Sequence, residues 1–467
     1  MQDNQIISEL IVKARAAQAQ AENYTQEQID NVCLAVGWEV YNDENIKKLA
    51  EKAVSETGMG NAADKIIKHK VKVLGVLKDI KGARSVGIIE RDEPRGISKD
   101  AKPVGVIGAL TPVTNPTATP SSNCLSIIKG RNAVIFAPHP GGKESCGLTV
   151  EFMRKGLAKV GAPADLIQYI KEPSIELSNE LMKQCDLVVA TGGPAMVKAA
   201  YASGTPAYGV GAGNSVQIIA EDADIADAIK KVTISKIFDY ATSCSSENSI
   251  IVEAGIYEKT KEEIIKNKGY ICSTAEKETL KNWMWVPNKK GIIGLNAKII
   301  AQSAVKIAKD AGLRIPENTV MLVVEGTEPG AGDKFSAEKL SPVLTMWKYS
   351  GIENAIDITE KLTNYSGYGH SCGIHTFRGD YIDKLALKMK SSRIMVRQPQ
   401  APANGGNFFN GMPSTVTLGC GTWGGNITTE NITYKHFLNI TWVSEPITPD
   451  KPSDTDIWGN FWKKYGK

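Results

Sequence analysis

The sequence lacks the features that mark several large classes of protein. No apolar run approaches the length of a membrane-spanning helix, and the N-terminus does not have the charged and apolar regions of a signal peptide. The 55 basic and 51 acidic residues nearly balance, which removes the usual reason to expect a nucleic-acid or membrane partner. We therefore expect a cytoplasmic protein with no nucleic-acid partner and no membrane partner.

Cysteine is sparse and has no metal-binding or disulfide pattern. No two cysteines form a C-x-x-C pair, and no group of cysteines and histidines has the spacing of a zinc site. Eight cysteines spread over 467 residues are typical of reduced thiols in a cytosolic protein. The sequence therefore predicts no bound metal. The eight are Cys33, Cys124, Cys146, Cys185, Cys244, Cys272, Cys372 and Cys420.

Apolar periodicity predicts an α/β fold. Residues 5–80 have apolar positions at three- and four-residue spacing, which indicates helices. Strands and helices then alternate in two runs, and this alternation predicts parallel sheets covered on both faces. The predicted strands lie at 132–137, 186–190, 215–220, 249–253, 319–324 and 393–396. The predicted helices lie near 143–160, 174–184, 194–203, 223–236, 256–268, 273–283, 299–311 and 378–390.

The segment A-T-S-C-S-S-E-N-S at 241–249 is a candidate catalytic centre. Cys244 lies among small polar residues just before a predicted strand, so a substrate carbonyl can approach its sulfur. A thiolate is the strongest side-chain nucleophile near neutral pH, and nearby amides or dipoles can activate it. The alternative is an ordinary buried thiol, the usual state of a cysteine.

Two further segments have a possible role in binding. Asn115, in T-P-V-T-N-P, precedes a proline and could donate its side-chain amide to a developing oxyanion, although Asn-Pro is also a common turn. The segment V-V-A-T-G-G-P-A-M-V at 188–197 places a glycine pair between a strand and a helix, as a dinucleotide diphosphate requires. It is not a complete G-x-G-x-x-G, so by itself it is a weak signal.

Taken together and in this order, these segments resemble the aldehyde dehydrogenase superfamily over nearly the whole chain. The closing segment L-G-C-G-T-W-G-G-N-I-T-T-E-N-I-T-Y-K-H-F-L-N-I at 418–440 is similar to the end of the CoA-acylating branch. Within that branch, T-S-C-S-S-E-N-S most resembles the acylating sulfoacetaldehyde dehydrogenases. The matching order is Asn115, A-P-H-P at 137–140, T-G-G-P at 191–194, G-V-G-A-G-N at 209–214, Cys244 and E-K-L-S-P-V-L at 338–344.

The resemblance implies a division of the chain. It implies an aldehyde dehydrogenase-like fold with a cofactor-binding domain at 1–238, to which 425–445 returns, and a catalytic domain at 239–424. A small β arm, formed by 85–106 and 446–467, would join subunits into a homodimer or homotetramer.

The resemblance also implies roles for individual residues. Cys244 would attack the aldehyde and carry first a thiohemiacetal and then a thioester, while Asn115 and the Cys244 backbone N–H hold the oxyanion. His370, in G-Y-G-H-S-C, matches a histidine near the active site, and the alternative is a structural buried histidine. The implied cofactor is NAD, with NADP not excluded, and CoA is the implied co-substrate. The cofactor-binding positions are Pro138, His139, Pro140, Thr191, Gly192, Gly193, Glu338 and Pro342.

One departure from the family pattern separates two reactions. Hydrolytic aldehyde dehydrogenases carry a glutamate, in a Glu-Leu-Gly-Gly pattern, which activates water. Here the matching place is Gly209-Val-Gly-Ala212, so that general base is missing. A thioester without it should resist water and react with a thiol such as CoA.

The substrate implied by the resemblance is a small anionic aldehyde, or its acyl-CoA in the reverse direction. Sulfoacetaldehyde is the first expectation, and acetaldehyde, propionaldehyde or succinate semialdehyde is the alternative. Arg397 is the leading candidate for the sulfonate because a guanidinium suits a tetrahedral anion, although a surface role is equally compatible. Arg393 is second, and hydroxyls could come from Thr117, Thr119 and Ser122. We interpret the lysine-rich segment 65–72 as a solvated helix face.

Overall fold

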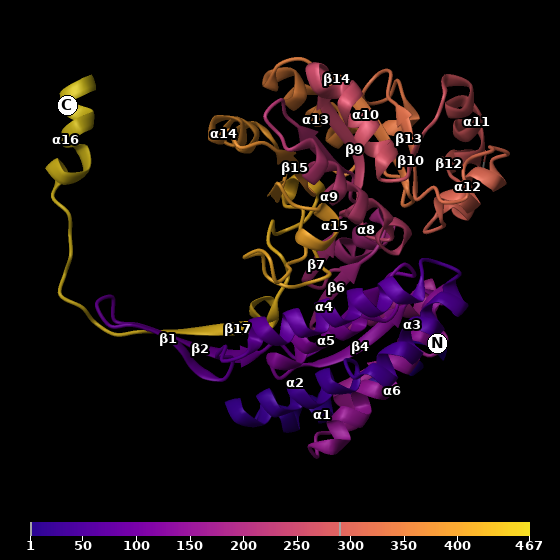
Figure 1. Ribbon diagram of the computed structural model, residues 1–467. Helices are drawn as coiled ribbons and strands as arrows, with labels where there is room; N and C mark the ends of the chain where they lie inside the picture. Colours follow the sequence, from indigo (N-terminus) through magenta and orange to yellow (C-terminus); the bar gives the residue numbers. More distant parts are fainter. Residues whose placement is uncertain (1, 289–290) are drawn as a thin grey trace.

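Two parallel sheets, each flanked by helices, and a projecting antiparallel arm make up the computed structural model (Figure 1). The structure describes residues 2–288 and 291–467. The α/β class and the parallel sheets expected from the sequence are confirmed. Within the described ranges, no helix combines the length and the apolarity needed to cross a membrane.

The first sheet has five parallel strands, and its core is apolar on both faces. β3 and β4 are buried along their whole length, as expected for a parallel sheet between helix layers. The strand order is β5 (Ile167–Tyr169), β4 (Ala133–Pro138), β3 (Val106–Thr111), β6 (Leu187–Thr191) and β7 (Ala207–Val210). The surrounding helices are α1 (Gln2–Ala21), α2 (Gln26–Glu39), α3 (Asp43–Thr57), α4 (Ala62–Ile80), α5 (Ala118–Lys129), α6 (Lys143–Lys159), α7 (Ile175–Gln184) and α8 (Pro194–Ala202).

The second sheet has seven parallel strands. Alternate residues of its central strands enter two different apolar clusters, one on each face, as the two-residue period of a strand requires. The strand order is β10 (Gly269–Ile271), β13 (Met321–Glu325), β14 (Val343–Tyr349), β9 (Glu247–Glu253), β8 (Ser215–Ile219), β15 (Cys372–His375) and β16 (Ile394–Val396). The remaining elements are α9 (Ile225–Ile237), α10 (Tyr257–Lys266), α11 (Thr274–Met284), the hairpin β11 (Trp285–Pro287) and β12 (Ile293–Leu295), α12 (Ala304–Asp310), α13 (Ile352–Tyr365), α14 (Gly379–Lys388) and α15 (Gln400–Ala403).

The boundary between the two bodies differs from the one expected at residue 238. β8 pairs with β9 and β15, and α9 packs beside α10, so residues 215–237 belong to the second sheet. The change of sheet occurs in the glycine-rich link between β7 and β8. Periodicity detects a strand, but hydrogen bonding between distant segments decides which sheet it joins.

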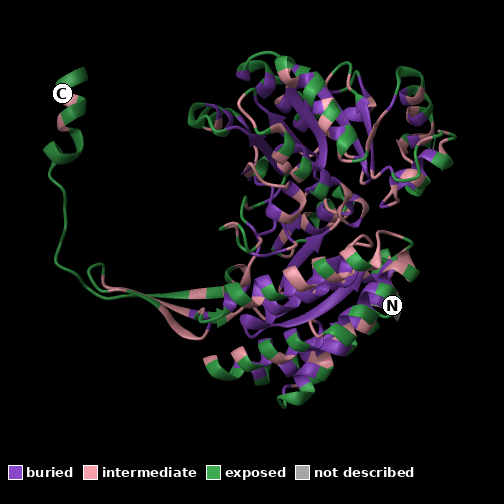
Figure 2. Ribbon diagram, in the orientation of Figure 1, coloured by how far each residue is buried: buried purple, intermediate pink, exposed green. Residues whose placement is uncertain are grey.

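A three-stranded antiparallel sheet projects from the first body (Figure 1). It consists of β1 (Gly87–Asp92), β2 (Ile97–Pro103) and β17 (Leu438–Ser444), followed by an extended tail and α16 (Asp454–Tyr465). Before reaching the arm, the chain passes the first core, to which Ile432 and Phe437 contribute. Figure 2 shows that the tail and α16 are mostly exposed, in contrast to the strands of the two parallel sheets.

Candidate active site

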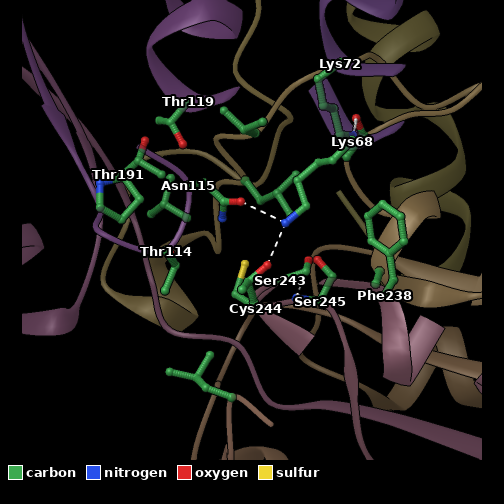
Figure 3. A pocket seen from close by; sticks show the side chains of 18 of the residues that line it. Lys68, Lys72, Thr114, Asn115, Thr119, Thr191, Phe238, Ser243, Cys244 and Ser245 are labelled. Carbon is green, nitrogen blue, oxygen red and sulfur yellow. Dashed lines mark hydrogen bonds between the residues drawn. The ribbon is translucent and has the colours of Figure 1, made fainter. Parts of the chain in front are cut away.

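A cavity of about 730 Å³ brings together most of the residues that the sequence singled out. Its walls come from both bodies: α4, the loop after β3, the β6–α8 turn, the β7–β8 link and the loop before β9. Figure 3 shows Cys244 and Asn115 facing one another across this space, with Lys68 reaching in beside them. The predicted site residues that line it are Asn115, Thr119, His139, Thr191, Gly192, Gly193, Cys244 and Glu338.

Cys244 lies on a loop with an unusual backbone. The short helix Phe238–Ala241 contains three successive residues with positive φ, at 50°, 51° and 61° for residues 239, 240 and 241. Residues other than glycine adopt this region at a cost of about 1–2 kcal/mol each. Gly213 allows the β7–β8 link to approach the loop, because a Cβ there would lie 1.8 Å from the Cys244 carbonyl oxygen. The loop is therefore held by its surroundings.

The Cys244 thiol contacts His370. The distance from Cys244 Sγ to His370 Nε2 is 3.2 Å, and His370 Nδ1 lies 2.9 Å from the Ser371 hydroxyl. If Nδ1 donates to Ser371, Nε2 is left as an acceptor for the thiol proton. The structure thus brings the predicted nucleophile and the predicted histidine into direct contact.

Burial keeps both groups neutral. Burial raises the pKa of the Cys244 thiol to about 12; Glu338 adds to the increase and Arg393 opposes it. Burial also lowers the pKa of His370 to about 3, and the charge of Arg393 acts in the same direction. The resting pair is therefore a thiol and a neutral imidazole. Such a pair can react when the imidazole takes the proton as the sulfur attacks.

Asn115 is oriented by a lysine. Lys68 Nζ donates to Asn115 Oδ1 at 2.8 Å, so the amide oxygen faces the lysine and the NH₂ group is left for another acceptor (Figure 3). The same amine donates to Asp239 and to Thr242 at 2.6 Å each. An amide held in this way is pre-organised to donate to an oxyanion formed near Cys244.

The solvated-face interpretation of residues 65–72 is wrong for its key members. Lys65, Lys68 and Lys72 lie on one face of α4, and their side chains are buried or nearly so. Lys65 and Lys68 both bind the fully buried Asp239 carboxylate, while Lys72 donates to the carbonyls of residues 405 and 406. Helical spacing of lysines is the same whether their face of the helix is solvated or buried, so spacing alone does not predict burial. The feature that accounts for the burial of Lys65 and Lys68 is their acidic partner, Asp239, which lies far along the chain.

Two features fit a nicotinamide dinucleotide. Glu338 Oε1 is buried, faces the cavity and has no hydrogen-bond partner in the structure, and burial raises the pKa of this carboxyl to about 8. Ribose hydroxyls would satisfy that acceptor. Gly193, the N-cap of α8, has no capping side chain and faces the cavity, as a diphosphate site at a helix N-terminus requires.

Gly209, the position at which hydrolytic relatives are expected to carry the general base, packs closely against α8. A Cβ on Gly209 would lie 2.6 Å from Val197 Cγ1 and 2.8 Å from the Tyr201 ring, both on α8. A larger side chain at this position would have to displace α8 packing. Val210, Gly211 and Ala212 line the cavity with backbone and apolar atoms.

Other predicted residues lie away from the cavity. The Arg397 guanidinium donates to the Thr376 carbonyl and stacks on Phe377 at 4.8 Å, so it is not brought to the substrate space. Arg393 is buried and donates to the His370 carbonyl at 3.3 Å, which supports the histidine. The predicted residues that are not among the lining residues are Thr117, Ser122, Pro138, Pro140, Pro342, His370, Arg393 and Arg397, of which His370 contacts the cavity-lining Cys244. In the described part of the chain, no three His, Cys, Asp or Glu side chains gather as a metal site would need.

This chain belongs to the aldehyde dehydrogenase family, whose model matches residues 2–271. It is 62% identical to a sulfoacetaldehyde dehydrogenase of Acholeplasma sp., over 98% of this chain and 94% of the relative. It is 59% identical to the sulfoacetaldehyde dehydrogenase (acylating) of Bilophila wadsworthia, over 99% of both chains. The crystal structure of an acetylating aldehyde dehydrogenase from Geobacillus thermoglucosidasius superposes with a TM-score of 0.92 at 37% identity, covering 97% of this chain and 99% of that one. The chain is accordingly an oxidoreductase that acts on aldehydes.

The thiol–imidazole pair predicts a characteristic pH dependence. Alkylation of Cys244 by iodoacetamide should vary little between about pH 5 and pH 8, because this range lies between the pKa values of about 3 and about 12. In His370→Asn, the rate should rise roughly tenfold per pH unit, because only the ionised thiol reacts. Mass spectrometry of the Cys244 peptide gives the rate, and the peptides of the other seven cysteines are internal controls. An inflection near neutral pH in the unmodified protein would show that the thiol or the imidazole titrates there, and it would contradict the neutral resting pair.

Proposed function

We propose that this protein interconverts sulfoacetaldehyde, CoA and NAD(P)⁺ with sulfoacetyl-CoA and NAD(P)H. The observation that carries this proposal is the contact of 3.2 Å between His370 and the cavity-lining Cys244, in a chain that has glycine at position 209, where hydrolytic relatives are expected to carry the water-activating glutamate. The names of the two relatives described above agree with it in substrate and, for one of them, in the acylating reaction.

The first half-reaction uses three groups of the chain. Cys244 Sγ bonds to the aldehyde carbon, and the thiol proton passes to His370 Nε2 at 3.2 Å. The carbonyl oxygen becomes an oxyanion and accepts hydrogen bonds from the Asn115 NH₂ group, which Lys68 turns toward the cavity, and from the Cys244 backbone N–H. A bound nicotinamide would supply the hydride acceptor, and loss of hydride from the thiohemiacetal carbon would leave a thioester on Cys244.

The second half-reaction transfers the acyl group. His370 first releases to solvent the proton that it took from Cys244. The CoA sulfur then bonds to the thioester carbon, the bond from that carbon to Cys244 Sγ breaks, and the CoA proton passes through His370 to return the cysteine to its thiol form. Water competes poorly with CoA for the thioester, because position 209 is a glycine and offers no carboxylate to activate the water. The dinucleotide would be held by Glu338 and by the turn at Thr191–Gly193.

The test is nicotinamide reduction by the purified protein with sulfoacetaldehyde, with and without CoA, and with acetaldehyde as the comparison. We expect turnover only with CoA, and a higher kcat/KM for sulfoacetaldehyde than for acetaldehyde. Sustained turnover without CoA would contradict the acylating mechanism. Equal or better use of acetaldehyde would contradict the choice of substrate and leave the mechanism standing.

We further propose that the arm and α16 join subunits of a homo-oligomer. The 12-residue α16 is short for a helix stable alone in water, and Trp458, Phe461 and Tyr465 expose about half or more of their surface. These rings contact each other along one face, with centroids 6.3 Å and 5.2 Å apart. A face of this kind suits a second copy of the chain, in a dimer or a tetramer.

Removal of residues 446–467 tests this interface. We expect sedimentation to show a smaller assembly for the truncated chain than for the intact one at equal concentration. A Lys463→Ala variant, altered on α16 but not among the aromatic residues, is the matched control and should sediment like the intact protein. An unchanged assembly after truncation would exclude the tail from the interface.

We also propose a cytoplasmic location, because Cys244 must stay reduced to act and the cytosol keeps thiols reduced. Fractionation of the source cells tests this: activity in the cytosolic fraction is expected, and activity confined to another compartment would contradict it.

A further inference from the structure

An anionic substrate needs a cation close to Cys244. In sulfoacetaldehyde a single methylene separates the sulfonate from the carbonyl carbon. When that carbon bonds to Cys244 Sγ, the sulfonate must lie within a few bond lengths of the sulfur. A charged group elsewhere in the chain cannot contact it.

Few cations meet this requirement. Among the described residues that line the cavity, Lys68 and Lys72 are the only lysines or arginines. Lys72 is buried, and its amine is directed at the Gly405 and Gly406 carbonyls, to which it donates at 2.6 and 3.1 Å. Lys68 therefore remains as the cation available to the substrate.

Lys68 stands beside the reacting atoms. Its amine bonds to Asn115, the oxyanion donor, and to Thr242, two residues before Cys244, and Figure 3 shows it directed into the space between Asn115 and the cysteine loop. The Lys68 side chain is only 10% exposed, so water screens its charge poorly.

The positive charge is only partly neutralised. Asp239 is fully buried behind the cavity wall, and its carboxylate is shared by Lys68 at 2.6 Å and Lys65 at 3.1 Å. Two cations thus divide one direct counterion. The carboxyl group that does line the cavity, Glu338, has its pKa raised to about 8 by burial and carries little charge at neutral pH. An anion bound in the cavity would neutralise the remaining positive charge.

We propose that Lys68 determines the specificity for an anionic aldehyde by holding its sulfonate beside Cys244. This inference rests on the proposed function. The three N–H groups of the amine already serve Asn115, Asp239 and Thr242, so the sulfonate is recognised by charge at close range. A sulfonate oxygen that replaces the Thr242 hydroxyl would add a charge-assisted hydrogen bond.

The test compares two substrates in Lys68→Gln, which removes the charge but keeps a donor for Asn115. The measured quantity is kcat/KM for sulfoacetaldehyde divided by kcat/KM for acetaldehyde, both with saturating CoA. We expect this ratio to fall by roughly tenfold to a hundredfold, mostly through KM for sulfoacetaldehyde, because the sulfonate loses an opposite charge at close range in a poorly screened site. Lys68→Arg, which keeps the charge, should retain most of the ratio.

The controls separate three explanations. Lys70→Gln alters an exposed lysine of the same helix, which pairs with Asp43, and should leave the ratio unchanged. If Lys68 only positions Asn115, Lys68→Gln will lower kcat/KM for both substrates by the same factor. The ratio will then be unchanged, and this result will overturn the inference. If the unmodified protein shows no preference for sulfoacetaldehyde, the proposed function fails instead. Should Lys68→Gln not fold, Lys68→Met, which suits the buried position, carries the same test.

Discussion

The buried carboxylate of Asp239 is the contact on which the geometry of the site depends. It connects α4 to the cysteine loop through Lys65 and Lys68, and it accepts a hydrogen bond from the backbone N–H of Asn61 at 3.0 Å. Burial by itself would raise the pKa of Asp239, but the two lysines more than offset this and hold the pKa below its usual value. Loss of one partner from such a buried cluster typically costs about 3–5 kcal/mol. This energy is of the same order as the strain of the three left-handed residues at 239–241, which place Cys244 at the cavity.

Much of the fold was predictable because its signals are local. The strands now seen as β4, β6 and β9, and helices such as α6 and α7, lie within one or two residues of their predicted bounds. α5, α13, β14 and α16 were not predicted. α5 begins with Ala, Thr, Pro and Ser and is buried along its whole length, so it has no amphipathic period to detect. The assignment of β8 to a sheet depends on pairing with β9 and β15, which no local pattern encodes.

The residues of the site also divide into those that local sequence motifs predict and those that only the folded structure shows. Cys244, Asn115 and Glu338 stand in short motifs, so a resemblance can find them, and all three line one cavity. Lys68 stands in no such motif, and its importance comes from Asp239, 171 positions away. Arg397 is the opposite case: its type suits a sulfonate, but its guanidinium is directed at Thr376 and Phe377. Residue type predicts chemistry, whereas only the fold decides which charges share a space.

The proposed mechanism depends most on a thioester that forms on Cys244 and persists until a thiol reacts with it. It is tested most directly by intact-mass and peptide mass spectrometry of the protein mixed with NAD and sulfoacetaldehyde in the absence of CoA. We expect one sulfoacetyl group per chain on the Cys244 peptide, persisting for many turnover times and disappearing when CoA is added. Continued nicotinamide reduction with an unmodified Cys244, or loss of the adduct to water before CoA is supplied, would contradict the account.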